Sequence, residues 1–177
     1  MEIEFLDTLA PMPRYKGERT RFKINDQEFE IAMKFMGNYE SKLANLELLR
    51  IIDGKKISNT TKQSGHAIFR IFSFITDWYI ECALKHQVKM AIVEGDATET
   101  GRLKIYDKMG ARFAEACNYK VRRIIKNPKN GTPQVIFMFY DSEYLRNNPE
   151  YTQKLNKDLK KFFNMGYKID TQGRNNE

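Results

Sequence analysis

The residues best suited to chemistry form a polar turn at the start of an apolar helix. Unpaired amides at a helix N-terminus point outward, and the helix dipole favours negative charge there. Glycine inside such a turn lets the backbone approach a ligand closely, because it has no Cβ. The sequence therefore predicts an anion site at this turn. Its residues are Thr61, Lys62, Gln63, Ser64, Gly65, His66 and Ala67.

A second candidate group lies about forty residues further on, in a helix expected over 101–116. Tyr106 falls on the apolar stripe of this helix, together with Leu103, Met109 and Phe113. A tyrosine in this position can serve as a proton donor, or it can pack in the core against a sheet. The pattern alone leaves both interpretations open.

Carboxylates that could act as a general base are scattered along the chain. Glu47 and Asp53 lie in and after one expected strand, and Glu94 and Asp96 end another. Each of them is also the kind of residue that faces solvent at a strand end. The short strand expected directly before the turn, over 56–60, contains no acid. The general base therefore stays undecided among these four residues.

Histidine and cysteine carry little chemistry in this chain. His66 could donate a hydrogen bond to an anion at the turn or face solvent, and His86 closes the apolar helix, where a cation suits the helix dipole. Two histidines so far apart predict no metal site. Cys82 and Cys117 are expected to be reduced thiols, with Cys117 packing as a small apolar residue.

The elements that must position these residues follow from the periodicity of the apolar residues. Alternation with a period of two predicts an antiparallel meander in the first half, with hairpin turns at 25–27 and Asp53-Gly54. The second half predicts a helix over 67–84, a strand over 88–93, the helix over 101–116, strands over 121–125 and 134–140, and a last helix from Pro149. We therefore predict an α/β fold with a mixed, mainly antiparallel twisted sheet flanked by helices. One domain is expected over 1–168, followed by a polar tail over 169–177.

The turn and the tyrosine helix together resemble the Gcn5-related N-acetyltransferases (GNAT). The run from Lys62 to Ala67 resembles the family's Arg/Gln-x-x-Gly-x-Gly/Ala turn, with Lys62 at the Arg or Gln position. The run from Ile105 to Gly110 resembles the Leu-Tyr-x-x-x-Gly part of its fourth helix, with Arg102 at an Ala position and Glu99 at an Asn position.

This resemblance implies that the chain binds acetyl-CoA and transfers its acetyl group to an amine, either a small amine or a protein lysine. It implies that Lys62, Gln63, Ser64, Gly65, His66, Ala67 and Arg102 bind the cofactor. It also implies that Tyr106 is the acid for the leaving thiolate and that a strand carboxylate is the base, for which we choose Glu47 among the four candidates.

Two further runs are similar to divergent acetyltransferase-like proteins of tailed bacteriophages. These are the stretch from Gly101 to Asp107 and the phenylalanine-rich stretch from Ala67 to Ser73. This similarity implies a phage-encoded protein in the host cytoplasm, or one associated with the virion. It leaves open a non-catalytic protein with the same fold that binds a phage or host partner.

The charge distribution supplies another alternative. The 177-residue chain has a formal net charge of +7, and the segment 119–130 has no acid. Its five basic residues predict either a solvated hairpin or a site for a polyanion such as nucleic acid. No apolar run is long enough to span a membrane, and the N-terminus lacks a basic signal-peptide region, so a cytoplasmic protein is expected. The five basic residues are Lys120, Arg122, Arg123, Lys126 and Lys129.

Overall fold

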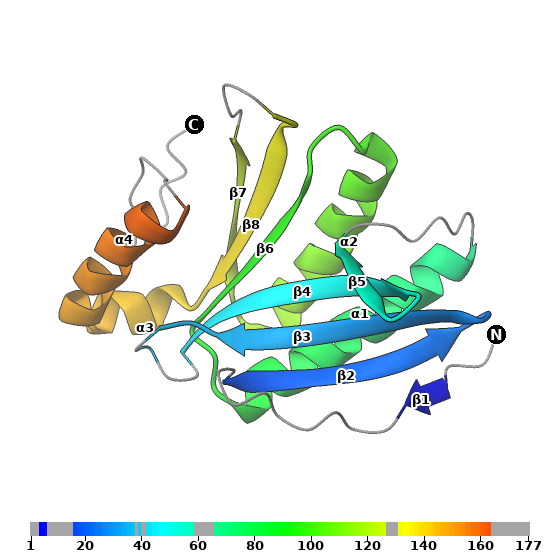
Figure 1. The fold of residues 1–177 in the computed structure, drawn as a ribbon. Helices are drawn as coiled ribbons and strands as arrows, with labels where there is room; N and C mark the ends of the chain where they lie inside the picture. The colour runs from blue at the N-terminus through cyan, green and yellow to red at the C-terminus, as the bar shows by residue number, and fades with distance from the viewer. Residues whose placement is uncertain are drawn as a thin grey trace.

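The computed structural model describes residues 4–6, 16–37, 39, 42–58, 66–126 and 131–163 (Figure 1). The predicted polar tail over 169–177 and the first part of the predicted anion turn, 61–65, lie outside these residues. The same holds for 127–130, which joins two strands of the predicted basic hairpin.

The first half of the chain forms the predicted antiparallel meander. Asn25 and Asp26 have positive φ angles of 47° and 62°, as do Asp53 and Gly54 at 49° and 72°. These values suit two-residue hairpin turns, whose twist matches that of the flanking strands. The strands are β1 (Glu4–Leu6), β2 (Gly17–Ile24), β3 (Gln27–Phe35), β4 (Leu43–Ile52) and β5 (Lys55–Ser58).

The second half contains every predicted helix and strand and one helix that was not predicted. The additional helix, α3, has six residues, and the Asp141 side chain accepts a hydrogen bond from Tyr144 N at its start. Six residues are too few for an apolar stripe to stand out in a sequence. The elements are α1 (His66–Lys85), β6 (Met90–Asp96), α2 (Thr100–Cys117), β7 (Lys120–Lys126), β8 (Gln134–Tyr140), α3 (Ser142–Asn147) and α4 (Pro149–Phe163).

The described strands form one mixed sheet in the order β1-β2-β3-β4-β6-β8-β7, with β5 pairing with β4 outside this path. Only β4 and β6 run parallel, and their pairing covers three residue pairs, from Leu43–Met90 to Asn45–Ile92. All other strand pairs are antiparallel. The predicted mixed, mainly antiparallel sheet is therefore confirmed.

Helices cover both faces of the sheet (Figure 1). On one face, α1 and α2 enclose a core that contains Phe22, Ile71 and Phe113. On the other face, α3 and α4 pack against a smaller core with Leu43, Met138 and Leu155. Because alternate residues of a strand point to opposite faces, β4 supplies Leu43 to one core and Ala44 to the other.

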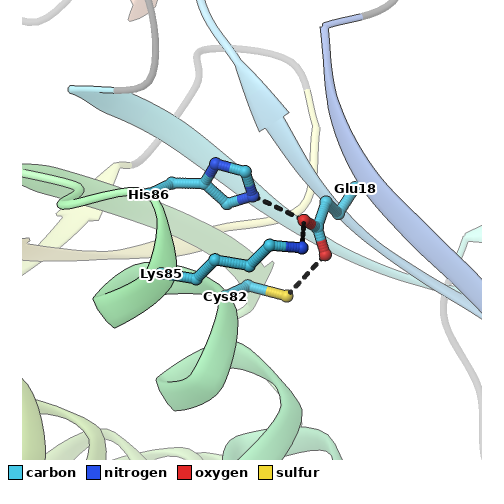
Figure 2. A network of polar contacts seen from close by, with 4 residues as sticks. All are labelled: Glu18, Cys82, Lys85 and His86. Carbon is cyan, nitrogen blue, oxygen red and sulfur yellow. Dashed lines mark hydrogen bonds and ion pairs between the residues drawn. The ribbon is translucent and has the colours of Figure 1, made fainter.

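A compact polar cluster fastens the end of α1 to the second strand (Figure 2). Glu18 Oε1 lies 2.5 Å from Lys85 Nζ and 2.5 Å from His86 Nε2, and Cys82 Sγ donates to Glu18 Oε2 at 3.3 Å. Partial burial opposes ionisation of Glu18, but the hydrogen bonds from Lys85, His86 and Cys82 lower its pKa to about 2. Burial and the Glu18 carboxylate raise the pKa of the Cys82 thiol, so Cys82 is a poor nucleophile here.

Replacing Glu18 with Gln should lower the free energy of unfolding by about 2 kcal/mol at pH 7. The full pKa difference corresponds to about 3 kcal/mol, and the exposure of Lys85 to solvent reduces the effect. Because the pKa of Glu18 is lower in the folded state, its contribution is complete above pH 4.5 and disappears between pH 4.5 and 2. Urea unfolding of both proteins over this pH range measures the difference.

The control is Glu115→Gln, which removes the same charge from an exposed position on α2. This variant should unfold within about 0.5 kcal/mol of the parent chain. A Glu18→Gln protein as stable as the parent at pH 7 would show that the cluster contributes nothing to stability.

Candidate functional site

The central feature of the sheet is a gap between its two parallel strands. Pairing between β4 and β6 ends at Asn45–Ile92, although β4 continues to Ile52 and β6 to Asp96. One edge of β4 is occupied by β3, which pairs with residues 44–51. The other edge must therefore be shared by β5 and β6. There β5 pairs only from Leu49 onward. No described strand pairs with this edge between Leu46 and Leu48.

A cavity of about 610 Å³ lies at this gap, a volume typical of small-molecule sites. It is bounded by β4 and β6, by α1 and α2, and by part of β8. Most of its wall is apolar, with polar groups at a few places, as in sites that bury a ligand and orient it. Its polar and charged side chains are Asn45, Glu47, Arg50, Thr76, Glu94, Asp96, Arg102, Thr132 and Gln134.

Tyr79 of α1 bonds to the backbone of β4 beside the gap. Its hydroxyl donates to the carbonyl oxygen of Glu47 at 2.6 Å, and the residue is 8% exposed. This carbonyl belongs to the stretch of β4 between its pairing with β6 and its pairing with β5. This bond satisfies the buried Tyr79 hydroxyl and ties α1 to β4 beside the gap.

Tyr106 of α2 forms part of the opposite wall. Its ring makes edge contacts with Phe72 at 5.5 Å and Phe137 at 6.3 Å between ring centroids. It also lies on Gly95 of β6, where an added Cβ would come within 2.9 Å of Tyr106 Cε2. Burial raises the pKa of Tyr106, and the neighbouring Arg102 guanidinium opposes this. The phenol therefore stays protonated at neutral pH.

Arg102 lies one helical turn before Tyr106 and lines the same cavity. Its Nη1 atom is 2.6 Å from Glu99 Oε2, and only 15% of its side chain is exposed. This ion pair holds the guanidinium at the N-terminal end of α2, beside the end of β6. The sequence analysis placed Arg102 and Tyr106 in one site, and in the structure both residues line the same wall of the cavity.

Glu47 of β4 also lines the cavity, but its carboxylate is engaged. Lys34 Nζ lies 2.6 Å from Glu47 Oε2, and Asn45 Nδ2 donates to Glu47 Oε1 at 3.3 Å. About a quarter of the Glu47 side chain is exposed. Both carboxylate oxygens of Glu47 are therefore already engaged by neighbouring side chains.

The other candidate carboxylates differ in position. Asp53 lies in the β4–β5 turn and does not line the cavity, whereas Glu94 and Asp96 do. Asp96 Oδ1 accepts hydrogen bonds from the hydroxyl and the amide of Thr98, and these lower the pKa of Asp96. Glu94 is exposed at the cavity rim. Three of the four sequence candidates thus lie around one cavity.

The predicted anion turn is described only at its end. Lys62, Gln63, Ser64 and Gly65 lie outside the described residues, and the side chains of His66 and Ala67 are not described either. His66 and Ala67 are the first two residues of α1, which confirms that a helix begins at this point. Anion binding by the turn stays a prediction.

Sequence reasoning missed two residues that shape the cavity. Tyr79 looked like an ordinary core residue of an apolar helix, and its bond to the Glu47 carbonyl depends on a contact 32 residues apart. Gly95 follows a clear apolar strand, and an isolated glycine at such a place can signal close approach of another group. That signal was present but did not identify Tyr106 as the group.

Within the described ranges, no group of three or more His, Cys, Asp or Glu side chains could hold a metal ion. None of the helices described here is long and apolar enough to cross a bilayer.

Comparison with known proteins gives weak structural similarity and no sequence match. No family model and no curated protein matches the chain. A GNAT-family acetyltransferase from Streptococcus pneumoniae aligns with a TM-score of 0.43 and 8% identity, covering 71% of this chain and 67% of its own. Mutant forms of the spermidine/spermine N-acetyltransferase SpeG from Vibrio cholerae align with a TM-score of 0.44 and 9% identity, and the alignment covers 76% of this chain and 73% of SpeG. The protein yncA from Salmonella typhimurium, solved with its cofactor acetyl-CoA, aligns with a TM-score of 0.42 and 5% identity, and the alignment covers 70% of this chain and 64% of yncA. Similarity at this level decides neither the family nor the activity of this chain.

Replacing Gly95 with Ala should displace the Tyr106 ring and lower the free energy of unfolding by about 1 kcal/mol. The new Cβ would overlap a partly buried ring that is packed between Phe72 and Phe137. Urea unfolding measures the change.

The matched control is Gly101→Ala on α2, where an added Cβ meets nothing within 4 Å. This substitution should stabilise the chain by up to about 1 kcal/mol, because Ala favours helix more than Gly does. If both alanine variants gained stability to the same extent, the contact between Tyr106 and Gly95 would be ruled out.

Proposed function

We propose that the chain is a GNAT-like acyltransferase that binds acetyl-CoA at the β4–β6 gap and transfers the acetyl group to an amine. The observation that carries this proposal is the cavity between the parted parallel strands. Three residues assigned to the site from sequence line it, namely Glu47, Arg102 and Tyr106. They come from two different elements that are more than fifty positions apart.

The chemistry of the gap suits a long, partly polar ligand such as the arm of acetyl-CoA. The β4 edge at Leu46–Leu48 has no strand partner among the described residues, and peptide-like groups of a ligand could bond to it. Apolar side chains such as Phe72 and Met109 would exclude water around the reacting group. The predicted turn Lys62–Ala67, at the start of α1, would hold the phosphates through backbone amides.

When bound, acetyl-CoA supplies an activated thioester. Tyr106 Oη is kept protonated by burial and would give its proton to the departing thiolate. Arg102, anchored by Glu99, would attract the negatively charged parts of the cofactor. Glu47 would accept the proton of the attacking amine, directly or through water, once the amine displaces Lys34 from its carboxylate.

A second function is favoured by the state of the carboxylates. Glu47 is bound by Lys34, and Asp96 by Thr98, so neither is an unengaged base. These contacts favour a protein that binds an acyl-CoA-like ligand without transferring the acyl group. A measurement of acetyl transfer distinguishes the two functions, because only the enzyme would release the thiol of CoA.

A phage origin, the identity of the acceptor and nucleic-acid binding are further proposals. A phage-encoded protein in the host cytoplasm, with a phage or host partner, rests only on the similarity of Gly101–Asp107 and Ala67–Ser73 to phage proteins. The acceptor, whether a protein lysine or a small amine, is likewise open to assay. Nucleic-acid binding by residues 120–129 is the weaker alternative, since the sequence has no recognised RNA- or DNA-binding signature.

Calorimetric titration with acetyl-CoA should show binding to one site, and Gly65→Glu should weaken it at least about tenfold. A carboxylate in the proposed turn would repel the pyrophosphate. Ala116→Glu is the matched control, since it adds the same charge at an exposed position near the end of α2 and should leave affinity unchanged. No heat at high acetyl-CoA concentration would refute the proposal, and equal affinity in both variants would remove the turn from the site.

Replacing Tyr106 with Phe should slow acetyl transfer about 10- to 1,000-fold while leaving acetyl-CoA affinity within about threefold, because only the acid is lost. Thiol release with a panel of primary amines, including spermidine and a lysine peptide, measures turnover. Tyr144→Phe on α3, outside the cavity, is the control and should retain full activity. A fully active Tyr106→Phe enzyme would exclude Tyr106 as the acid.

A further inference from the structure

We propose that the outer edge of β7 is a docking site for an extended acidic segment of another protein, which adds to the sheet as a strand. This proposal is independent of the acyltransferase proposal, because β7 contributes nothing to the cavity. It rests on the position of β7 in the sheet, on its exposed side chains and on its charge.

β7 is the last strand of the sheet (Figure 1). It pairs with β8 along its whole length, from Lys120–Tyr140 to Lys126–Gln134, and no other described strand pairs with it. An edge strand of seven residues presents a row of backbone donors and acceptors that can template another strand. Its length matches a typical strand, so an added segment could pair over its full extent.

The side chains on one face of this edge combine apolar and basic groups. Val121, Arg123 and Ile125 alternate along β7 and therefore share a face. Val121 is 39% exposed and Ile125 is 55% exposed. Arg123 lies between them, 3.1 Å from Asp107 of α2, with 40% of its side chain exposed. The face suits a strand that places a carboxylate opposite Arg123 and apolar side chains on either side.

The charge of β7 favours an acidic partner over a second copy of this chain. The strand contains Lys120, Arg122, Arg123 and Lys126 and has no acidic residue. An antiparallel pair of β7 strands centred on Arg123 would put the two Arg123 residues opposite each other and each Lys120 opposite Lys126. A register centred on Arg122 would put the two Arg122 residues opposite each other. Like charges directly opposite each other destabilise a strand pair, so self-association is disfavoured.

Nucleic acid fits this edge less well than a peptide strand does. Phosphates would pair with the basic side chains but would leave Val121 and Ile125 against a charged backbone. A β-strand satisfies the backbone edge, the two apolar side chains and the arginine together.

The probe is a blocked peptide of sequence Glu-Ile-Thr-Glu-Glu-Val-Glu. In the antiparallel register it places Glu opposite Arg123, Ile opposite Ile125 and Val opposite Val121. Fluorescence anisotropy should show saturable binding that weakens as salt rises. Hydrogen exchange should show new protection of amides in 120–126 when the peptide is bound. A peptide of the same composition in scrambled order should bind at least about tenfold more weakly.

Arg123→Glu should weaken the peptide at least about tenfold, whereas Lys55→Glu, the same charge change in the β4–β5 hairpin, should leave affinity unchanged. Exchange protection of the other strands in Arg123→Glu checks that the variant is folded. If the variant is not folded, the test uses the parent chain and a peptide that is N-methylated at alternate amides. This peptide should not bind when its methyl groups face β7.

The proposal fails if the peptide does not bind, if bound peptide protects amides elsewhere, or if the β7 amides that do not bond to β8 are already protected in the free protein. It fails equally if oligodeoxythymidine protects β7 and the peptide does not, or if sedimentation shows a dimer that Arg123→Glu changes.

Discussion

The structure depends on one constraint, the loss of pairing between β4 and β6 after Asn45–Ile92. Two parallel strands that separate inside a sheet expose backbone groups that must find other partners. On the β4 side, β5 takes the edge from Leu49, and the Tyr79 hydroxyl ties α1 to β4 at the Glu47 carbonyl beside the unpaired stretch. On the other side, β6 stays fully paired with β8 along its remaining edge. Because β5 occupies the β4 edge from Leu49, β6 cannot follow that edge over the full length of β4.

The two helices that bound the gap are linked to each other and to the sheet. Arg112 of α2 donates to Ser73 at 2.9 Å and also bonds to Asp77, both on α1. At the far end of α1, Glu18 binds Lys85 and His86 and so fixes the helix to β2 (Figure 2). With α1 fixed at its C-terminus and joined to α2, Tyr79 and Tyr106 face the cavity from two walls that belong to one packed layer. The position of each tyrosine thus follows from contacts outside the cavity.

The sequence predicted the parts of this arrangement that depend on local pattern. Alternation revealed the hairpin around Asn25 and Asp26, and helical spacing revealed α1 and α2, because both signals repeat within a few residues. The parallel contact of β4 with β6 escaped local reasoning, since α1 and β5 separate the strands along the chain. The strand just before the turn has no acid, whereas the cavity lies against β4 and Glu47. Cofactor and catalytic roles came only from family resemblance, and the described residues do not test them.

The protonation of the cavity constrains any reaction in it. Burial keeps the Tyr106 phenol protonated, while the hydrogen bonds from Thr98 lower the pKa of Asp96, and Lys34 forms an ion pair with Glu47. At neutral pH the cavity thus presents a proton donor on α2 and carboxylates on β4 and β6. An amine cation would be attracted to the carboxylates but must lose a proton before it can attack. Of the three cavity carboxylates, Glu47 alone is held by a lysine on a neighbouring strand. An ammonium group that replaces Lys34 would form the same ion pair with Glu47, so this carboxylate would bind and orient an amine before the amine loses its proton.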